Sequence, residues 1–193
     1  MAHLSDALEI LPRPAERRDD NWILTYTGKQ FWPTSPRPED IDIEDIYHAL
    51  SLTCRFAGHC HEFYSVAQHS VLVAQHVPHD DFMWAMLHDA SEAYLADVAR
   101  PVKKSPEMEG YRLIESRLMR CIAERFDLPW PMPCSVKVAD LRALATERRD
   151  LMPRSSQKWP CLEGLSPFSE RIEPLTPSES RIFFHSHIRD YIA

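Results

Sequence analysis

The amino-acid sequence predicts an all-α protein built from amphipathic helices, with one short β-hairpin near the N-terminus. Its 193 residues include only four glycines but sixteen prolines. This balance is typical of helices separated by rigid loops and unlike a glycine-rich β protein. In addition, apolar residues recur with helical spacing from Ile41 onwards. No internal repeat or low-complexity tract interrupts this pattern.

The expected elements follow the chain in order. Residues 1–20 end in a charged run and are predicted to form a flexible arm, and residues 21–193 a single domain. NWILTYTGKQFWP has two β-prone runs around Thr-Gly and predicts the hairpin. DVARPVKKSPEME, with its two prolines, is expected to be a loop. Helices are expected over about 41–55, 64–77, 80–94, 107–127, 135–151 and 177–192.

Composition argues against several classes of protein. The net charge of −7 disfavours a broad surface for nucleic-acid polymers or anionic membranes, although a few local cations could still hold a small anion. No apolar run approaches the ~20 residues of a membrane helix, and no secretory signal is evident. The cysteines are odd in number, five, and include no C-x-x-C pair, which favours reduced thiols in the cytoplasm.

Two of the expected helices place a polar side chain on an otherwise apolar face. In YSVAQHSVLVAQHV, His69 shares a stripe with Val66 and Val73. In SVKVADLRALATERRDL, Asp140 shares a stripe with Val136. A lone histidine on such a face is usually a hydrogen-bonded core residue, and a lone aspartate is usually an ion-pair or capping partner.

A third helix adds two more possible metal ligands, which makes a metal site more favourable than separate core or ion-pair roles. In AMLHDASEAYLAD, His88 and Asp89 follow an apolar run. Together with His69 and Asp140 they form a mixed nitrogen and oxygen set that suits Co, Mn, Zn, Fe or Ni, and Mg less well. Glu92 lies four residues after His88 and could orient or deprotonate an attacking water, or could be an exposed helix glutamate.

The order His69, then His88-Asp89, then Asp140 resembles the H…HD…D signature of the HD-domain metal-dependent phosphohydrolases. The dipeptide alone is a weak signal. However, YSVAQHSVLVAQHV, MLHDASEAYLADVARPVKK and VKVADLRALATERRDL resemble family blocks in the same order. Over roughly residues 22–190 the chain is similar to bacterial 5′-deoxynucleotidases and phage dATP triphosphohydrolases. The resemblance implies an HD-domain helical bundle and a homo-oligomer.

The resemblance also implies a role for each matching residue. His69, His88, Asp89 and Asp140 match the metal ligands. The other matches are Glu92 at the attacking water, Asp97 on the sugar side as a second catalytic residue, Arg55, Lys103 and Lys137 at the phosphates, and Phe56 beside the nucleoside. Lys103 could instead be a solvated loop cation and Phe56 a core residue. ATERRDL is expected to form a charged helix face, in which Glu147 could support the ligands.

The implied activity is metal-dependent hydrolysis of the 5′-phosphate ester of deoxynucleotides. The products would be a deoxynucleoside with phosphate from a monophosphate, or with triphosphate from a triphosphate such as dATP. Both substrates remain open, because both groups of relatives share the cationic positions. Two alternatives also remain: an HD phosphodiesterase or alarmone hydrolase, and a catalytically silent metal-containing nucleotide sensor.

Overall fold

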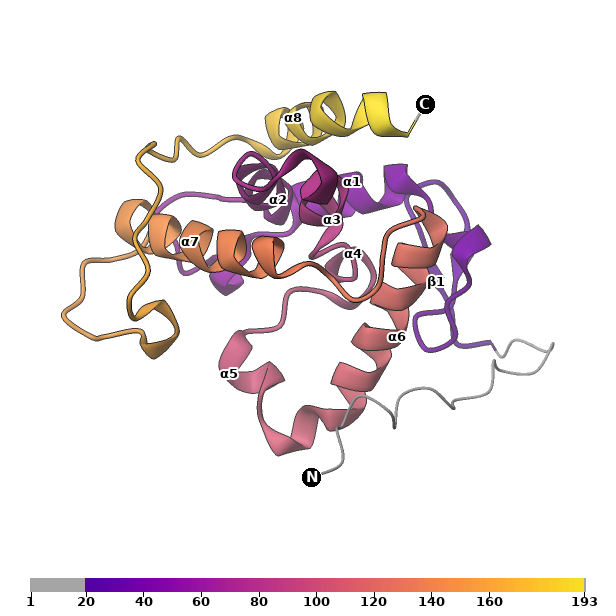
Figure 1. Ribbon diagram of the computed structural model, residues 1–193. Coiled ribbons are helices and arrows are strands. Elements are labelled where there is room, and N and C mark those ends of the chain that lie inside the picture. The colour runs from indigo at the N-terminus through magenta and orange to yellow at the C-terminus, as the bar shows by residue number, and fades with distance from the viewer. Residues whose placement is uncertain (1–19, 193) are drawn as a thin grey trace.

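The computed structural model describes residues 20–192 and confirms an all-α fold with a short β-hairpin (Figure 1). The predicted flexible arm, residues 1–20, lies outside the described residues except for Asp20. Across residues 20–192, none of the helices combines the length and apolar character needed to span a membrane.

The hairpin is attached to the helical core by its second strand. Strand β1 (Ile23–Leu24) pairs antiparallel with β2 (Gln30–Phe31). The connecting turn passes through Gly28 at a φ of +79°, a conformation that glycine adopts without a Cβ clash. Phe31 is fully buried, and its ring stacks on Tyr94 with the ring centroids 4.0 Å apart.

The helices expected over 41–55, 64–77, 107–127, 135–151 and 177–192 are present, with ends shifted by a few residues, as α1 (Ile43–Leu52), α2 (Val66–Ala74), α6 (Glu109–Arg125), α7 (Cys134–Asp150) and α8 (Pro177–Ile188). The described residues also form three shorter helices, α3 (Phe82–Leu87), α4 (Glu92–Leu95) and α5 (Arg100–Lys103). Side-chain caps set several of the starts. The carboxylate of Asp42 accepts from an amide at the start of α1, and the hydroxyl of Ser65 does the same for α2. Thr176 and Glu179 form a capping box at α8.

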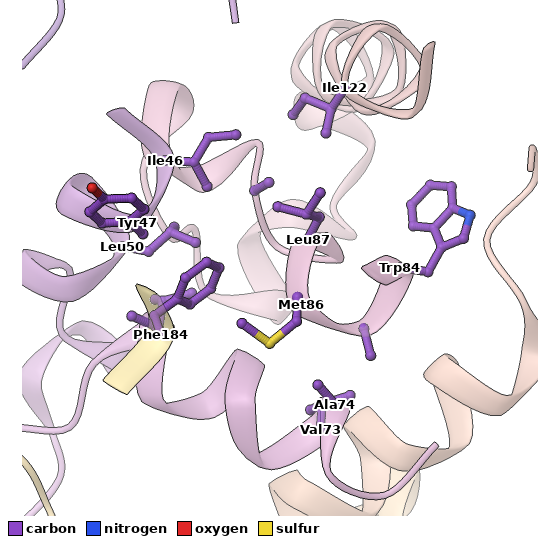
Figure 2. Packing of buried hydrophobic residues seen from close by; sticks show 14 of the residues in the cluster. Ile46, Tyr47, Leu50, Val73, Ala74, Trp84, Met86, Leu87, Ile122 and Phe184 are labelled. Atoms are coloured by element: carbon purple, nitrogen blue, oxygen red, sulfur yellow. The ribbon is translucent and has the colours of Figure 1, made fainter. Parts of the chain in front are cut away.

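Helix α2 is the central element of the bundle. It packs against α1, α3, α7 and α8, and Figure 1 shows it between α8 and α7. Figure 2 shows apolar side chains from five helices converging on this centre; they include Ile46, Leu50, Val73, Trp84, Met86, Leu87, Ile122 and Phe184. Because α2 is covered on several sides, polar groups on its inner face need partners from the neighbouring helices.

The single helix expected over 80–94 is wrong in detail. The chain forms α3, then a tight turn over residues 88–91, then α4. The carbonyl of Ala85 accepts from the His88 imidazole, at 2.7 Å. The amides of Ala90 and Glu92 then bond to carbonyls three residues back, instead of the four of an α-helix. The His88 side chain therefore competes with the helical hydrogen-bond pattern where the helix breaks.

The stretch expected to be a loop between residues 97 and 109 also contains a short helix. Helix α5 covers Arg100–Lys103 and has Pro101 in its first turn. Proline is tolerated there because its missing N–H would have no helical partner. Proline at this position therefore allows a helix to begin rather than preventing one.

Asp150, at the end of α7, holds part of the following irregular segment against that helix. Its carboxylate accepts two hydrogen bonds from Arg149 at 2.7 Å, one from Arg171 at 3.0 Å and one from the amide of Ile172 at 3.1 Å. The hydrogen bonds from Arg149 outweigh the effect of burial and lower the pKa of Asp150.

We expect Asp150→Asn to lower the free energy of unfolding by about 1.5–3 kcal/mol near neutral pH, the usual contribution of hydrogen bonds to a charged group. Because the folded pKa is depressed, this contribution is present above about pH 4 and is lost as the pH falls through the folded value. Urea denaturation at several pH values measures it. The gap between the variant and the parent protein should narrow as the pH falls below about 4. A gap independent of pH would contradict this account, and Asp190→Asn, at an exposed aspartate, is the control.

Candidate metal centre

Two buried histidines from different helices meet at the centre of the bundle. His69 lies on α2 and is fully buried, and His88 lies in the turn that follows α3. Their Nε2 atoms are 3.2 Å apart. The Nδ1 atom of His69 lies 2.6 Å from Glu147 Oε1, and that of His88 lies 2.7 Å from the Ala85 carbonyl oxygen. These oxygens accept hydrogen bonds, so both Nδ1 atoms carry a proton and both Nε2 atoms face the centre.

Two carboxylates complete this group. Asp89 Oδ2 lies 3.2 Å from His88 Nε2 and 3.6 Å from His69 Nε2. Asp140 Oδ1, from α7, lies 3.3 Å from His69 Nε2. The ligand atoms of His69, His88 and Asp140 all lie within 4.8 Å of one another, so this cluster could hold a metal ion. The structure thus brings together the four residues that the sequence predicts as ligands.

The chemistry of these donors fits a bound cation. The inward-facing imidazole nitrogens and carboxylate oxygens can each ligate a cation, and carboxylates crowded into a partly buried site are unfavourable without positive charge between them. Burial and Arg55 oppose the charged form of His69, but Glu147 and Asp140 raise its pKa to about 9. Burial alone would raise the pKa of Asp89, yet His88, His69 and Arg55 hold it well below its usual range. The centre therefore favours positive charge, which a divalent metal supplies.

Glu147 supports the cluster from behind, as the sequence suggested it could. It is fully buried on α7, and its two oxygens accept from His69 Nδ1 and from Arg55 Nη2, the latter at 3.1 Å. Burial would raise the pKa of Glu147, but Arg55 and His69 lower it. A carboxylate on the second nitrogen of a ligating histidine fixes the ring orientation and the tautomer.

We expect Glu147→Gln to weaken metal affinity by about 10–100-fold, because a glutamine amide holds the His69 tautomer less firmly than a carboxylate. Competition with a chromogenic chelator measures the affinity. Glu163→Gln, at an exposed loop glutamate, is the matched control and should bind metal like the parent protein. If Glu147→Gln folded normally and bound metal as tightly as this control, the supporting role would be lost.

Arg55 lies inside this network, where the sequence placed it at the substrate phosphates. Its side chain is 11% exposed, and Nη1 lies 3.4 Å from Asp89 Oδ2 while Nη2 pairs with Glu147. Both carboxylates, with burial opposing them, raise the pKa of Arg55. The neighbouring Phe56 is partly buried at a φ of +57°, and its ring lies 6.4 Å from that of Trp159. Phe56 therefore lies outside the fully buried core, and its ring centroid is 5.4 Å from the Arg55 guanidinium carbon.

The predicted acid Glu92 is buried next to the cluster, so the alternative of an exposed glutamate is wrong. Its Oε2 has no hydrogen-bond partner among the described residues. Burial, followed by the charges of Asp89 and Asp97, raises the pKa of Glu92 well above its usual value. Lys103 Nζ lies 3.8 Å from Glu92 Oε1 and donates to Glu115 at 2.6 Å. Lys103 is thus a paired cation near the candidate acid.

Asp97 is partly buried, and it lies close enough to Asp89, Arg55 and Lys103 for their charges to affect its pKa. Burial raises the pKa of its carboxyl, and the charge of Asp89 adds to that rise, while Arg55 and Lys103 oppose it. Asp97 therefore lies within electrostatic range of the metal-ligand cluster.

One cation at the site was missed by sequence reasoning. Arg100 Nη2, from α5, lies 3.5 Å from Asp140 Oδ2, and its side chain is 45% exposed. The sequence signal for this cation is the basic run RPVKK, from which only Lys103 is predicted to contact the phosphates. Lys137 is exposed on α7, about one helical turn before Asp140, and makes no ion pair among the described residues. Arg100 therefore joins the predicted lysines as a candidate anion contact.

Comparison with known proteins establishes a family without assigning an activity. No protein-family model matches the chain. It is 42% identical to the uncharacterized protein YfdR of Escherichia coli K12 over 172 residues, which are 88% of this chain and 95% of YfdR. It is 37% identical to an uncharacterized protein of Rhodobacter capsulatus over 127 residues, which are 61% of this chain and 64% of that protein. The chain therefore belongs to the protein family of YfdR.

Proposed function

We propose that this protein is an HD-type metal-dependent phosphohydrolase that cleaves the 5′-phosphate ester of deoxynucleotides. One observation carries the proposal: imidazole nitrogens and carboxylate oxygens from α2, α7 and the turn after α3 converge on one point next to the buried Glu92. This set suits a divalent transition metal such as Co, Mn, Zn, Fe or Ni better than Mg.

The ligands would hold the metal, and Glu92 would handle proton transfer. Bound to His69, His88, Asp89 and Asp140, a divalent metal would supply Lewis-acid chemistry, lowering the pKa of a water and polarising a phosphoryl oxygen. Glu92 has a buried oxygen with no hydrogen-bond partner in the described part of the chain, and this oxygen can accept the proton from the attacking water. Lys103, 3.8 Å from the other Glu92 oxygen, can help orient that carboxylate.

The residues around the cluster support a small anionic substrate. Arg100 and Lys137 are exposed cations near Asp140, and Lys103 adds a third, on a protein whose net charge is −7. Such cations stabilise negative charge on phosphate oxygens. In the proposal Asp97 accepts a hydrogen bond from the sugar and Phe56 packs beside the nucleoside.

The cellular setting is also part of the proposal. The thiols of Cys54, Cys60, Cys134 and Cys161 are free, which suits the reducing cytoplasm where we place the enzyme. Because the chain resembles the HD phosphohydrolases, we also propose that it forms a homo-oligomer.

Product analysis tests the activity. The protein, loaded with Mn²⁺ or Co²⁺, is incubated with each deoxynucleoside mono- and triphosphate, followed by chromatography and an assay for free phosphate. We expect a deoxynucleoside to appear. Release of phosphate from a monophosphate identifies a 5′-deoxynucleotidase, and release of intact triphosphate from a triphosphate identifies a triphosphohydrolase. No product with any deoxynucleotide or metal would refute the proposal.

A further inference from the structure

Two cysteines lie at the ends of the loop that carries Arg55 and Phe56. In the stretch CRFAGHC, Cys54 Sγ and Cys60 Sγ are 3.8 Å apart, and both cysteines are free and partly exposed. A disulfide has its sulfurs about 2.05 Å apart, so the thiols need to approach by only about 1.8 Å. Side-chain rotation can provide much of such a movement.

The backbone holds one end of this loop in place. Cys54 and Ser65 form an isolated antiparallel bridge, in which Arg55 N donates to Tyr64 O at 2.9 Å and Val66 N donates to Thr53 O at 3.0 Å. Cys60 Sγ lies 3.9 Å from the Arg55 carbonyl oxygen. The second thiol therefore lies over the backbone of the residue that pairs with Asp89 and Glu147.

The loop between the thiols is held in an unfavourable conformation. Phe56, Ala57 and Gly58 have φ values of +57°, +50° and +79°. The left-handed region suits glycine but costs free energy at phenylalanine and alanine. Ala57 and Gly58 are also exposed, so few packing contacts hold them. A covalent link between the ends of the loop would oppose its opening.

We propose that Cys54 and Cys60 form a reversible disulfide that clamps the loop carrying Arg55 and Phe56. The oxidant is a small-molecule disulfide such as oxidised glutathione. One cysteine thiolate attacks it and displaces a thiolate, and the second cysteine then attacks the mixed disulfide and displaces the other. Two protein thiols are oxidised, the small disulfide is reduced to two thiols, and the protons of the cysteines pass to the leaving groups.

Peptide mapping tests the bond itself, whether or not the protein is a hydrolase. Trypsin cuts between Arg55 and Phe56, so a Cys54–Cys60 disulfide joins two peptides, 30–55 and 56–103, that are otherwise separate. After treatment with oxidised glutathione we expect this linked pair in mass spectra, and its loss after dithiothreitol. We also expect a rise in Tm of about 5 °C on oxidation.

Matched variants make the result decisive. Cys60→Ser should show neither the linked pair nor the rise in Tm, whereas Cys134→Ser/Cys161→Ser, which replaces two exposed cysteines, should retain both. Glutathione attached separately to Cys54 and Cys60, without a linked pair, would overturn the proposal. So would a linked pair that leaves the Tm unchanged.

The effect of the clamp on substrate rests on the proposed function. With the metal-loaded protein, oxidation should lower KM for the deoxynucleotide about threefold, because ordering the loop in advance reduces the cost of binding. Cys60→Ser should have the same KM with and without oxidant. An unchanged KM in the oxidised parent protein would remove the link to the site. Absence of any hydrolysis would refute the proposed function, while peptide mapping would still decide the disulfide.

Discussion

Asp140→Asn should lose metal more completely than a conservative change in an outer-shell partner such as Glu147. The carboxylate of Asp140 lies 3.3 Å from His69 Nε2 and is the acceptor that α7 contributes to the cluster. Asparagine keeps the shape but removes the negative charge, and an amide is a poor ligand for a transition metal. Changes in outer-shell partners typically cost 10–100-fold in metal affinity, so loss of a direct ligand should exceed about 100-fold.

Metal content after dialysis, measured by inductively coupled plasma mass spectrometry, gives the result. Asp127→Asn is the control, because Asp127 is exposed and has a φ of +52°, which asparagine tolerates. We expect the control to retain metal and Asp140→Asn to lose it, with both showing the helical circular dichroism of the parent. Full metal occupancy in folded Asp140→Asn would remove Asp140 from the ligand set.

Glu92→Gln should abolish most turnover while leaving the metal in place. Glu92 is buried, and one of its oxygens lacks a partner among the described residues, which suits a group that binds the attacking water. Glutamine has nearly the same shape but cannot accept the proton. Loss of a general base typically costs about 10²–10⁴-fold in rate. We therefore expect a loss of that size in kcat with normal metal content.

Two readouts separate this role from a structural one. Loss of a buried charge in a crowded acidic site should leave the Tm of Glu92→Gln unchanged or raised, since burial and Asp89 both disfavour the ionised form. Glu163→Gln, at an exposed glutamate, serves as the control for rate and metal content. A rate within a few-fold of the parent would exclude Glu92 as the base.

Much of the site could be predicted because its residues leave a periodic signal. His69 and Asp140 interrupt apolar stripes on helices, and such positions face the interior whatever the details of packing. The fold class followed from the same periodicity. The break at His88 could not be predicted in this way, since it accompanies an imidazole that bonds to the Ala85 carbonyl only in the folded chain.

Contacts between distant segments account for what was missed. The pairing of Arg55 with Glu147 joins residues 92 positions apart, so the sequence offers no local sign that Arg55 lies inside the network. The contact of Arg100 with Asp140 likewise joins residues far apart in the chain, and it depends on the short helix α5, which has Pro101 in its first turn. Hydrophobic periodicity reports which face is buried but not which polar partners meet there.

The central claim is that one metal, held by the histidine and aspartate cluster, carries the hydrolysis. Its most direct test is a titration of chelator-treated protein with Mn²⁺, in which bound metal and nucleoside release are measured in the same samples. The account predicts that activity rises in proportion to occupancy and reaches its plateau at one metal per chain. Nucleoside release without bound metal, or full occupancy without release from any deoxynucleotide, would contradict it.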